Sequence, residues 1–246
     1  MLRASLSFYI LKILDIFFFK QGNIAVSESD RSHCNQTIDK FIYFGNLYPH
    51  EPQFQSGLFY GLALTPRFER DIAHDARKNM PFADGSVKGF QSQDVFEHIP
   101  YQKIPAIMDD IFRCLQKGGI FRLSLPDYNS PLLRRRSVYD ADGNILCDLA
   151  MGGMVSATLN DGVQVGFAGE EGDSHIWFPT FNTVLPLILT SEIRKCDTIQ
   201  IHHAWIDKDK WICKPFEQGV MPVSRVPPHD MRADGKPISI VIDFIK

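Results

Sequence analysis

The sequence predicts an α/β fold with a mainly parallel sheet, helices on both faces and one antiparallel strand at its C-terminal end. Short apolar runs at 40–45, 57–64 and 120–126 are typical of buried strands. The segment 104–115 repeats its apolar residues every three or four positions, which places them on one face of a helix. The run PISIVIDFI at 237–245 predicts a strong last strand. Strands that alternate with a helix and short loops form right-handed βαβ units, and these units build parallel sheets.

Local signals place the other elements along the chain. A turn at Asp84-Gly85 leads into a strand that runs through Phe90. Pro105 fits the first turn of the helix at 104–115, and Gly118-Gly119 ends it. Beyond residue 130 the pattern is looser. We expect three further elements: a strand at 70–76, a helix at 179–193 and a strand at 198–205.

The chain divides into an N-terminal helix, a linker and one large domain. Residues 1–21 are mainly apolar and predict a helix, whereas the polar, turn-rich residues 22–39 predict a linker. Residues 40–246 then form the domain, with an insertion around 129–178. Lys12 interrupts the first apolar run, which argues against a transmembrane span. We expect the helix to pack on the domain, with a peripheral membrane contact as the alternative.

Composition limits the classes of function. The 246 residues are 44% hydrophobic and 22% charged, as in an ordinary soluble globular protein. A net charge of −3 gives no general attraction to polyanions, so we expect no nucleic-acid partner. The five cysteines form no CxxC pair, which favours reduced thiols and a cytoplasmic protein. The sequence predicts no oligomeric state.

Carboxylates and a glycine follow the predicted strand ends. In an open α/β sheet, ligands bind outside the carboxyl ends of the strands. The residues just beyond those ends are Gly45, Ala63, Asp75, Asp94 and Asp127. No glycine-rich phosphate loop with a lysine is present, so a cationic or hydroxyl-rich ligand is favoured over a phosphate.

The central block resembles class I S-adenosylmethionine-dependent methyltransferases of the Methyltransferase-11-like type. Between residues 57 and 128 the chain carries an acidic residue, MPFADGS, a strand, EH, a helix and RCLQKGG, in the order typical of that family. The resemblance implies a Rossmann-like sheet with an antiparallel last strand and S-adenosyl-L-methionine as cofactor. It also implies methyl transfer to an oxygen or nitrogen of a small molecule or glycan.

The resemblance further implies the contacts of the cofactor. Asp75 stands where the family's acidic residue accepts a hydrogen bond from the adenine amino group, and the Ala76 amide would face the ring. The end of the next strand would line the methionine part. The expected cofactor-binding residues are Gly45, Asn46, Ala63, Asp75, Ala76, Ser92, Gln93 and Asp94.

Three residues are candidates for a catalytic base: His98, Asp94 and His175. His98 occupies the histidine position of the EH motif. His175, together with Trp177, could stack on a sugar ring and take a proton. We expect Glu97 to serve the start of the following helix, and Asp127 and Tyr128 to lie where the acceptor enters.

The remaining charged and histidine clusters favour structural roles. The pairs His202-His203 and His229-Asp230 lack a spaced third ligand, so we expect no metal site. The run Arg134 to Arg136 favours a solvated loop over a site for an anionic acceptor.

Two departures from the family pattern leave a second function open. Gly45 is the only glycine at the expected place in the loop after the first strand, where the family has several. Ala63 stands where the family has an acidic residue that binds the ribose hydroxyls. The alternative is therefore a catalytically inactive protein with a methyltransferase fold that acts in binding or as a scaffold.

Overall fold

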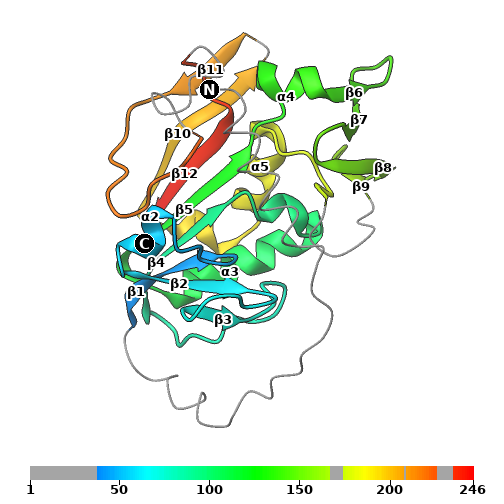
Figure 1. Ribbon diagram of the computed structural model, residues 1–246. Helices are drawn as coiled ribbons and strands as arrows, with labels where there is room; N and C mark the ends of the chain where they lie inside the picture. Colours follow the sequence, from blue (N-terminus) through cyan, green and yellow to red (C-terminus); the bar gives the residue numbers. More distant parts are fainter. Residues whose placement is uncertain (1–37, 167–173, 208, 226–234) are drawn as a thin grey trace.

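The computed structural model describes residues 38–166, 174–207, 209–225 and 235–246. Its centre is an eight-stranded sheet with the strand order β11-β10-β12-β5-β4-β1-β2-β3 (Figure 1). The strands are β1 Ile38–Phe44, β2 Phe59–Ala63, β3 Asp71–Ala73, β4 Val87–Gln93, β5 Leu115–Pro126, β10 Thr198–Asp207, β11 Lys210–Cys213 and β12 Ser239–Ile245.

Strand directions confirm the predicted fold class. The five neighbouring strands from β3 to β5 are parallel to one another. The last strand, β12, runs antiparallel between β5 and β10, as the sequence predicts. The hairpin strand β11 adds one further antiparallel edge, which the sequence pattern does not predict. Because β1 to β5 are parallel, their carboxyl ends all meet at one edge of the sheet.

One face of the sheet is covered by α3 (Ile104–Cys114), α5 (Phe181–Leu189) and the short η4 (Glu192–Lys195), as Figure 1 shows. The predicted apolar stripe of α3 is confirmed, since Ile104, Ile107, Met108 and Ile111 are all buried in the main core. The helix ends earlier than predicted: Leu115 already pairs with Val87, so β5 starts five residues before the expected strand.

A short helix and an extended segment cover the other face. The helix is α2 (Pro52–Gln55), and Met221 from the segment packs with four apolar residues of β1 and its surroundings, namely Phe41, Tyr43, Leu47 and Phe59. The approach is so close that a Cβ atom on Gly89 would lie 2.7 Å from the Met221 side chain. Residues 215–225 thus take much of the space over β1 and β4 on this face.

Residues 137–166 form a second, four-stranded sheet beside the main one (Figure 1). Its strands are antiparallel: β6 Ser137–Tyr139, β7 Ile145–Asp148, β8 Gly152–Thr158 and β9 Gln164–Gly166. The helix α4 (Pro131–Arg136) leads into it from β5. These residues lie within the region predicted as an insertion.

Several predicted boundaries differ from the structure. Residues 38 and 39 belong to β1 and not to the linker, and the helix expected at 179–193 divides into α5 and η4. Ser191 separates the two, and its backbone is extended. The predicted N-terminal helix 1–21 and most of the linker lie outside the described residues. Within the described part of the chain, no helix is long and apolar enough to cross a membrane.

Candidate functional site

The loop after β1 brings backbone and polar atoms to the carboxyl edge of the sheet. Gly45 has a φ of 105°, a conformation that favours glycine, and its amide donates to the Leu62 carbonyl across to β2. The next side chain, Asn46, has a buried Oδ1 with no hydrogen-bond partner in the described structure. A buried acceptor without a donor is uncommon in native proteins and marks a place where a ligand donor fits.

The predicted cofactor residues lie on neighbouring strand ends. Ala63 is the last residue of β2, and its side chain is buried. Ser92 lies near the end of β4, and its buried Oγ also lacks a hydrogen-bond partner in the described structure. These orphaned atoms at the ends of β1 and β4 fit a polar ligand. The next residue after Ala63 is the exposed Leu64, so β2 ends without an acid that could bind ribose hydroxyls.

The Asp75 carboxylate is held by Arg77. Both oxygens accept hydrogen bonds from the Arg77 guanidinium at 2.9–3.1 Å, and Oδ1 also accepts from the Arg77 amide. These side-chain hydrogen bonds lower the pKa of the Asp75 carboxyl. Asp75 and Ala76 follow β3 at the expected edge. Adenine binding by these two residues remains a prediction, and it requires Arg77 to release one carboxylate oxygen.

Gln93 and Asp94, at the end of β4, both contact residues of the segment 215–225. The Gln93 amide bonds with the backbone and hydroxyl of Ser224, and Asp94 forms an ion pair with Arg225. Asp94 has a φ of 56°, the only positive value among non-glycine residues that the structure describes. Aspartate tolerates this left-handed conformation better than most residues, and such backbone strain is typical of functional sites.

Three polar side chains meet just beyond Asp94. Phe96–His98 form the short helix η2, and residues 174–177 lie alongside it, with the Ile176 amide donating to the Glu97 carbonyl at 2.9 Å. The rings of His98 and His175 are 4.9 Å apart, edge to face. Oε1 of Glu97 lies 3.7 Å from Nε2 of His175. The structure thus brings together two of the three predicted bases, His98 and His175, with Asp94 three residues before Glu97 in the chain.

A chain of hydrogen bonds starts at Nδ1 of His175 and orients its ring. Nδ1 of His175 lies 2.5 Å from the Tyr128 hydroxyl, and that hydroxyl donates to Asp148 at 2.5 Å. Asp148 also accepts from Arg136 at 2.8 Å. An Asp148 carboxylate paired with a guanidinium can only accept, so Tyr128 gives it its single proton and accepts the Nδ1 hydrogen of His175. This fixes the lone pair of His175 on Nε2.

Burial sets the charge state of this cluster. Burial raises the pKa of the Glu97 carboxyl well above its usual range, and the Asp94 carboxylate raises it further. Burial also lowers the pKa of the His175 imidazole well below its usual range, and His98 beside it acts in the same direction. Both shifts favour the uncharged forms of Glu97 and His175, which argues against an ion pair across their 3.7 Å contact.

Three sequence predictions about these residues are wrong. Glu97 makes no capping hydrogen bond, because its side chain is fully buried, with Oε1 3.7 Å from Nε2 of His175. Trp177 cannot stack on a sugar ring, since it is fully buried and donates to the Phe96 carbonyl. The run Arg134 to Arg136 is the end of α4 and not a solvated loop, because Arg136 pairs with the buried Asp148.

The structure gives Asp127 a buried structural position. Its two oxygens accept from the amides of Trp205 at 2.6 Å and Asn129 at 3.0 Å. Burial raises the pKa of the Asp127 carboxyl to about 7. The side chain joins the ends of β5 and β10, whereas Tyr128, the next residue, belongs to the histidine cluster. The prediction that Asp127 lies near the acceptor entrance stays a prediction.

The histidine pair of β10 has protein partners. His202 lies 2.9 Å from Asp243 and stacks on Phe216, while the His203 ring contacts the edge of Phe216. The pair His229-Asp230 lies outside the described residues.

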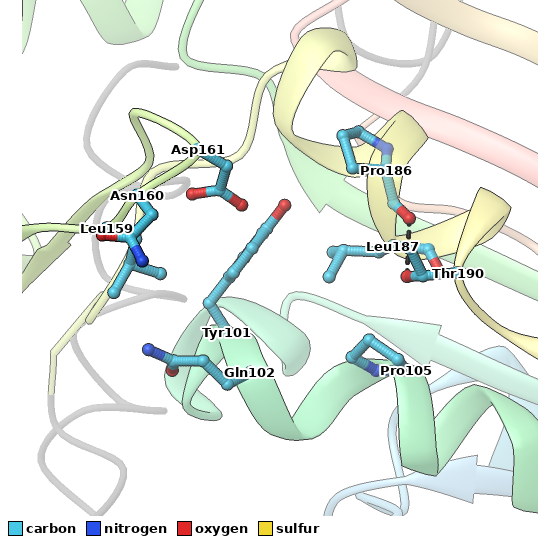
Figure 2. A pocket seen from close by; sticks show the side chains of 9 residues that line it. All are labelled: Tyr101, Gln102, Pro105, Leu159, Asn160, Asp161, Pro186, Leu187 and Thr190. Carbon is cyan, nitrogen blue, oxygen red and sulfur yellow. Dashed lines mark hydrogen bonds between the residues drawn. The ribbon is translucent and has the colours of Figure 1, made fainter.

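A surface cavity of about 420 Å³ lies between α5 and the second sheet. Figure 2 shows the Tyr101 ring standing between Asp161 and Leu187. Burial, with Asp161 nearby, raises the pKa of Tyr101 to about 12. None of the predicted site residues lines this cavity, so it gives no support to the predicted cofactor or base residues.

A family model described as "Methyltransferase domain" matches residues 63–123. This range runs from the end of β2 into β5 and includes Glu97 and His98. The resemblance to methyltransferases is confirmed over this segment. No curated protein matches the chain.

Solved methyltransferase structures also resemble the chain. A putative S-adenosylmethionine-dependent methyltransferase from Listeria monocytogenes is 13% identical, with a TM-score of 0.44, and the match covers 89% of this chain and 95% of that one. One from Mesorhizobium loti is 12% identical with a TM-score of 0.44, covering 89% and 96%. The 1,6-didemethyltoxoflavin-N1-methyltransferase of Burkholderia thailandensis is 9% identical, with a TM-score of 0.42, covering 88% and 74%. Because these scores are below 0.5, the fold assignment rests on the strand order.

Proposed function

We propose that the protein is an S-adenosylmethionine-dependent methyltransferase that methylates an oxygen or nitrogen of a small molecule or glycan. The observation that carries this proposal is the contact between His98 and His175 at the carboxyl edge of the sheet. His98 lies inside the segment that matches the methyltransferase family model, five residues after the end of β4, which is expected to line the cofactor. The acceptor class follows from the resemblance in the sequence.

The side chains of the cluster suit a base for a hydroxyl or amine acceptor. Nδ1 of His98 lies 2.9 Å from the Ser174 carbonyl oxygen, which can only accept, so Nδ1 carries the hydrogen and Nε2 is the basic nitrogen. His175 has the same arrangement through Tyr128. Neutral imidazoles with a fixed tautomer are well suited to remove a proton.

The strand ends would bind and orient the cofactor. S-adenosylmethionine, when bound, supplies the sulfonium methyl group. Asn46 and Ser92 offer buried polar atoms at the ends of β1 and β4, and Asp75 offers a carboxylate after β3. Asp94 and Arg225 lie where the methionine part is expected. Methyl transfer depends mainly on the proximity and orientation of the two reactants, which these side chains would set.

Calorimetric titration with S-adenosylmethionine and S-adenosylhomocysteine tests the proposal. We expect both to bind, and Asp75→Ala to weaken binding by about 1–3 kcal/mol, the cost of leaving a ligand donor unpaired. Asp142→Ala, which removes an exposed carboxylate in the turn between β6 and β7, is the matched control and should bind as the wild type does. If the folded wild type binds neither compound, the proposal fails and a non-catalytic binding function takes its place. Once an acceptor is found, His98→Ala should slow methyl transfer more than it weakens cofactor binding.

A further inference from the structure

The Glu97 carboxyl group is buried without a hydrogen-bond partner. Its side chain is 0% exposed, and neither Oε1 nor Oε2 receives a hydrogen bond in the described structure. Burying a carboxyl group without compensation is costly, so buried carboxyl groups are normally paired or coordinate metals. The nearest nitrogen, Nε2 of His175 at 3.7 Å, carries a lone pair and donates nothing. At 3.7 Å the carboxyl group and this nitrogen are too far apart for a hydrogen bond, so neither satisfies the other.

The lone pairs of two imidazoles have the same arrangement. For His98 and His175 alike, Nδ1 donates its hydrogen to an oxygen, from Ser174 and Tyr128 respectively, which leaves Nε2 as the ligating atom. Metal-binding histidines characteristically donate the other ring N–H to a carbonyl or to a carboxylate-linked group. The Tyr128 hydroxyl is linked to a carboxylate in this way, because it donates to Asp148, which also accepts from Arg136.

The three side chains are close enough to share one ion. One ligand atom each from Glu97, His98 and His175 all lie within 4.8 Å of one another. Metal–ligand bonds of 2.0–2.2 Å in tetrahedral geometry place neighbouring ligand atoms about 3.4 Å apart. The Glu97–His175 separation of 3.7 Å already approaches that value.

We propose that Glu97, His98 and His175 bind a divalent transition-metal ion. One carboxylate oxygen and two imidazole nitrogens favour zinc or ferrous iron over magnesium and calcium, which prefer oxygen ligands. Three protein ligands leave coordination positions open for a water or substrate atom. Neighbouring Glu97 and His98 form no recognisable metal-ligand spacing in the sequence, because the third ligand, His175, lies 77 residues after His98, beyond β9.

The place of the ion suggests its use. The site begins three residues after Asp94, at the edge where the cofactor is expected. With both Nε2 atoms bound to the ion, the ion takes over the role of the histidine base: it would bind the acceptor oxygen or nitrogen and make it more acidic, and the proton would pass to water. This use rests on the proposed methyltransferase function, whereas metal binding itself does not.

Direct metal analysis of the full chain tests the site. The protein is treated with EDTA, supplied separately with Zn²⁺, anaerobic Fe²⁺, Co²⁺ or Mg²⁺, and freed of unbound ion. We expect about one Zn²⁺, Fe²⁺ or Co²⁺ per chain and no retained Mg²⁺. Bound Zn²⁺ should also raise the temperature of unfolding, because it binds the folded state only.

Variants separate ligation from a structural role. Glu97→Gln keeps the shape of the side chain, and should fold without metal as the wild type does but lose the Zn²⁺-dependent rise in unfolding temperature. Tyr128→Phe should weaken binding by about 10–100-fold, as for other outer partners of a metal ligand. His74→Ala removes a histidine outside the cluster and is the control, so it should bind Zn²⁺ as the wild type does.

Two results would overturn the proposal. One is a folded wild type that retains none of the three transition ions, and the other is Glu97→Gln binding Zn²⁺ as tightly as the wild type. Metal is measured without S-adenosylmethionine, and cofactor binding is measured on the EDTA-treated protein. Failure of the metal site and failure of the methyltransferase proposal are therefore separate results.

Discussion

The Tyr128 hydroxyl lies 2.5 Å from Nδ1 of His175 and 2.5 Å from a carboxylate oxygen of Asp148, so it links the histidine cluster to the second sheet. Tyr128 follows β5, whereas Asp148 ends β7. The orientation of a candidate base thus depends on a residue outside the main sheet. We infer that the second sheet helps to position His175 in addition to extending the fold.

Removing the Asp148 charge should destabilise the protein. Asp148 is fully buried and accepts from Tyr128, Arg136 and the amides of Ala150 and Met151. In Asp148→Asn, an NH2 group replaces one of the two accepting oxygens. The donors that pointed at that oxygen are then buried without an acceptor. We expect a loss of about 2–3 kcal/mol in the free energy of unfolding, below the full cost of breaking a buried pair because Arg136 is partly exposed.

Urea unfolding of Asp148→Asn and its control measures this loss. Asp142→Asn, which changes an exposed carboxylate in the turn before β7, should change the free energy of unfolding by less than about 0.5 kcal/mol. Equal stabilities of the two variants would show that the Tyr128–Asp148–Arg136 chain contributes nothing to folding.

Asp127 should make stability fall as the pH rises. Its pKa is raised from an ordinary 3.8 to about 7 in the folded protein. The folded state therefore binds more protons than the unfolded state between these values, and the contribution present below pH 4 is lost as the pH rises through 7. Between pH 5 and pH 8 the wild type should lose about 2–3 kcal/mol through this group.

Asp127→Asn isolates that contribution. The variant is less stable overall, because the NH2 of its amide opposes one of the two N–H donors, but it lacks this titration. We expect the stability difference between wild type and variant to shrink from pH 5 to pH 8 in denaturant unfolding. A difference that stays constant or grows with pH would contradict the assigned direction.

Arg122 should be essential for the C-terminal half of the sheet. Its guanidinium binds both oxygens of Asp243 at 2.7 Å and three backbone carbonyls of the segment 217–221. Arg122→Met leaves the buried Asp243 without its main partner, which typically costs about 3–5 kcal/mol. Thermal unfolding measures the effect, with the exposed Arg135→Met as control. A cost no larger than that of the control would refute this role.

The sequence predicts the fold where side-chain periodicity is strong. The stripe of 104–115 and the apolar run at 237–245 both bury their residues in the main core, and the structure confirms α3 and β12. The sequence does not predict the second sheet, because its strands are largely exposed. In β8, for example, no residue is fully buried, so its sequence carries no alternation of apolar and polar residues.

The site is predicted less completely than the fold. Motif order indicates His98 and Asp94, since both lie in the matched segment. The role of Glu97 depends on its burial against His175, a contact over 78 residues of sequence that no local pattern encodes. The placement of Arg225 on Asp94 is equally long-range. Burial of an ionisable group beside a distant partner is a property of packing, and a single sequence does not reveal it.

The ion pair between Asp94 and Arg225 yields the last prediction, because it combines a charge contact with a left-handed backbone. Asp94→Asn keeps a residue that tolerates a positive φ, whereas Asp94→Ala adds a backbone cost of about 1–2 kcal/mol. Both variants lose the charge that holds Arg225 at the expected methionine side of the cofactor. We therefore expect both to bind S-adenosylhomocysteine more weakly than the wild type, but only Asp94→Ala to lose substantial stability. Calorimetry and thermal unfolding on the same samples separate the two effects. Unchanged affinity in a stably folded Asp94→Asn variant would show that this carboxylate only shapes the chain after β4.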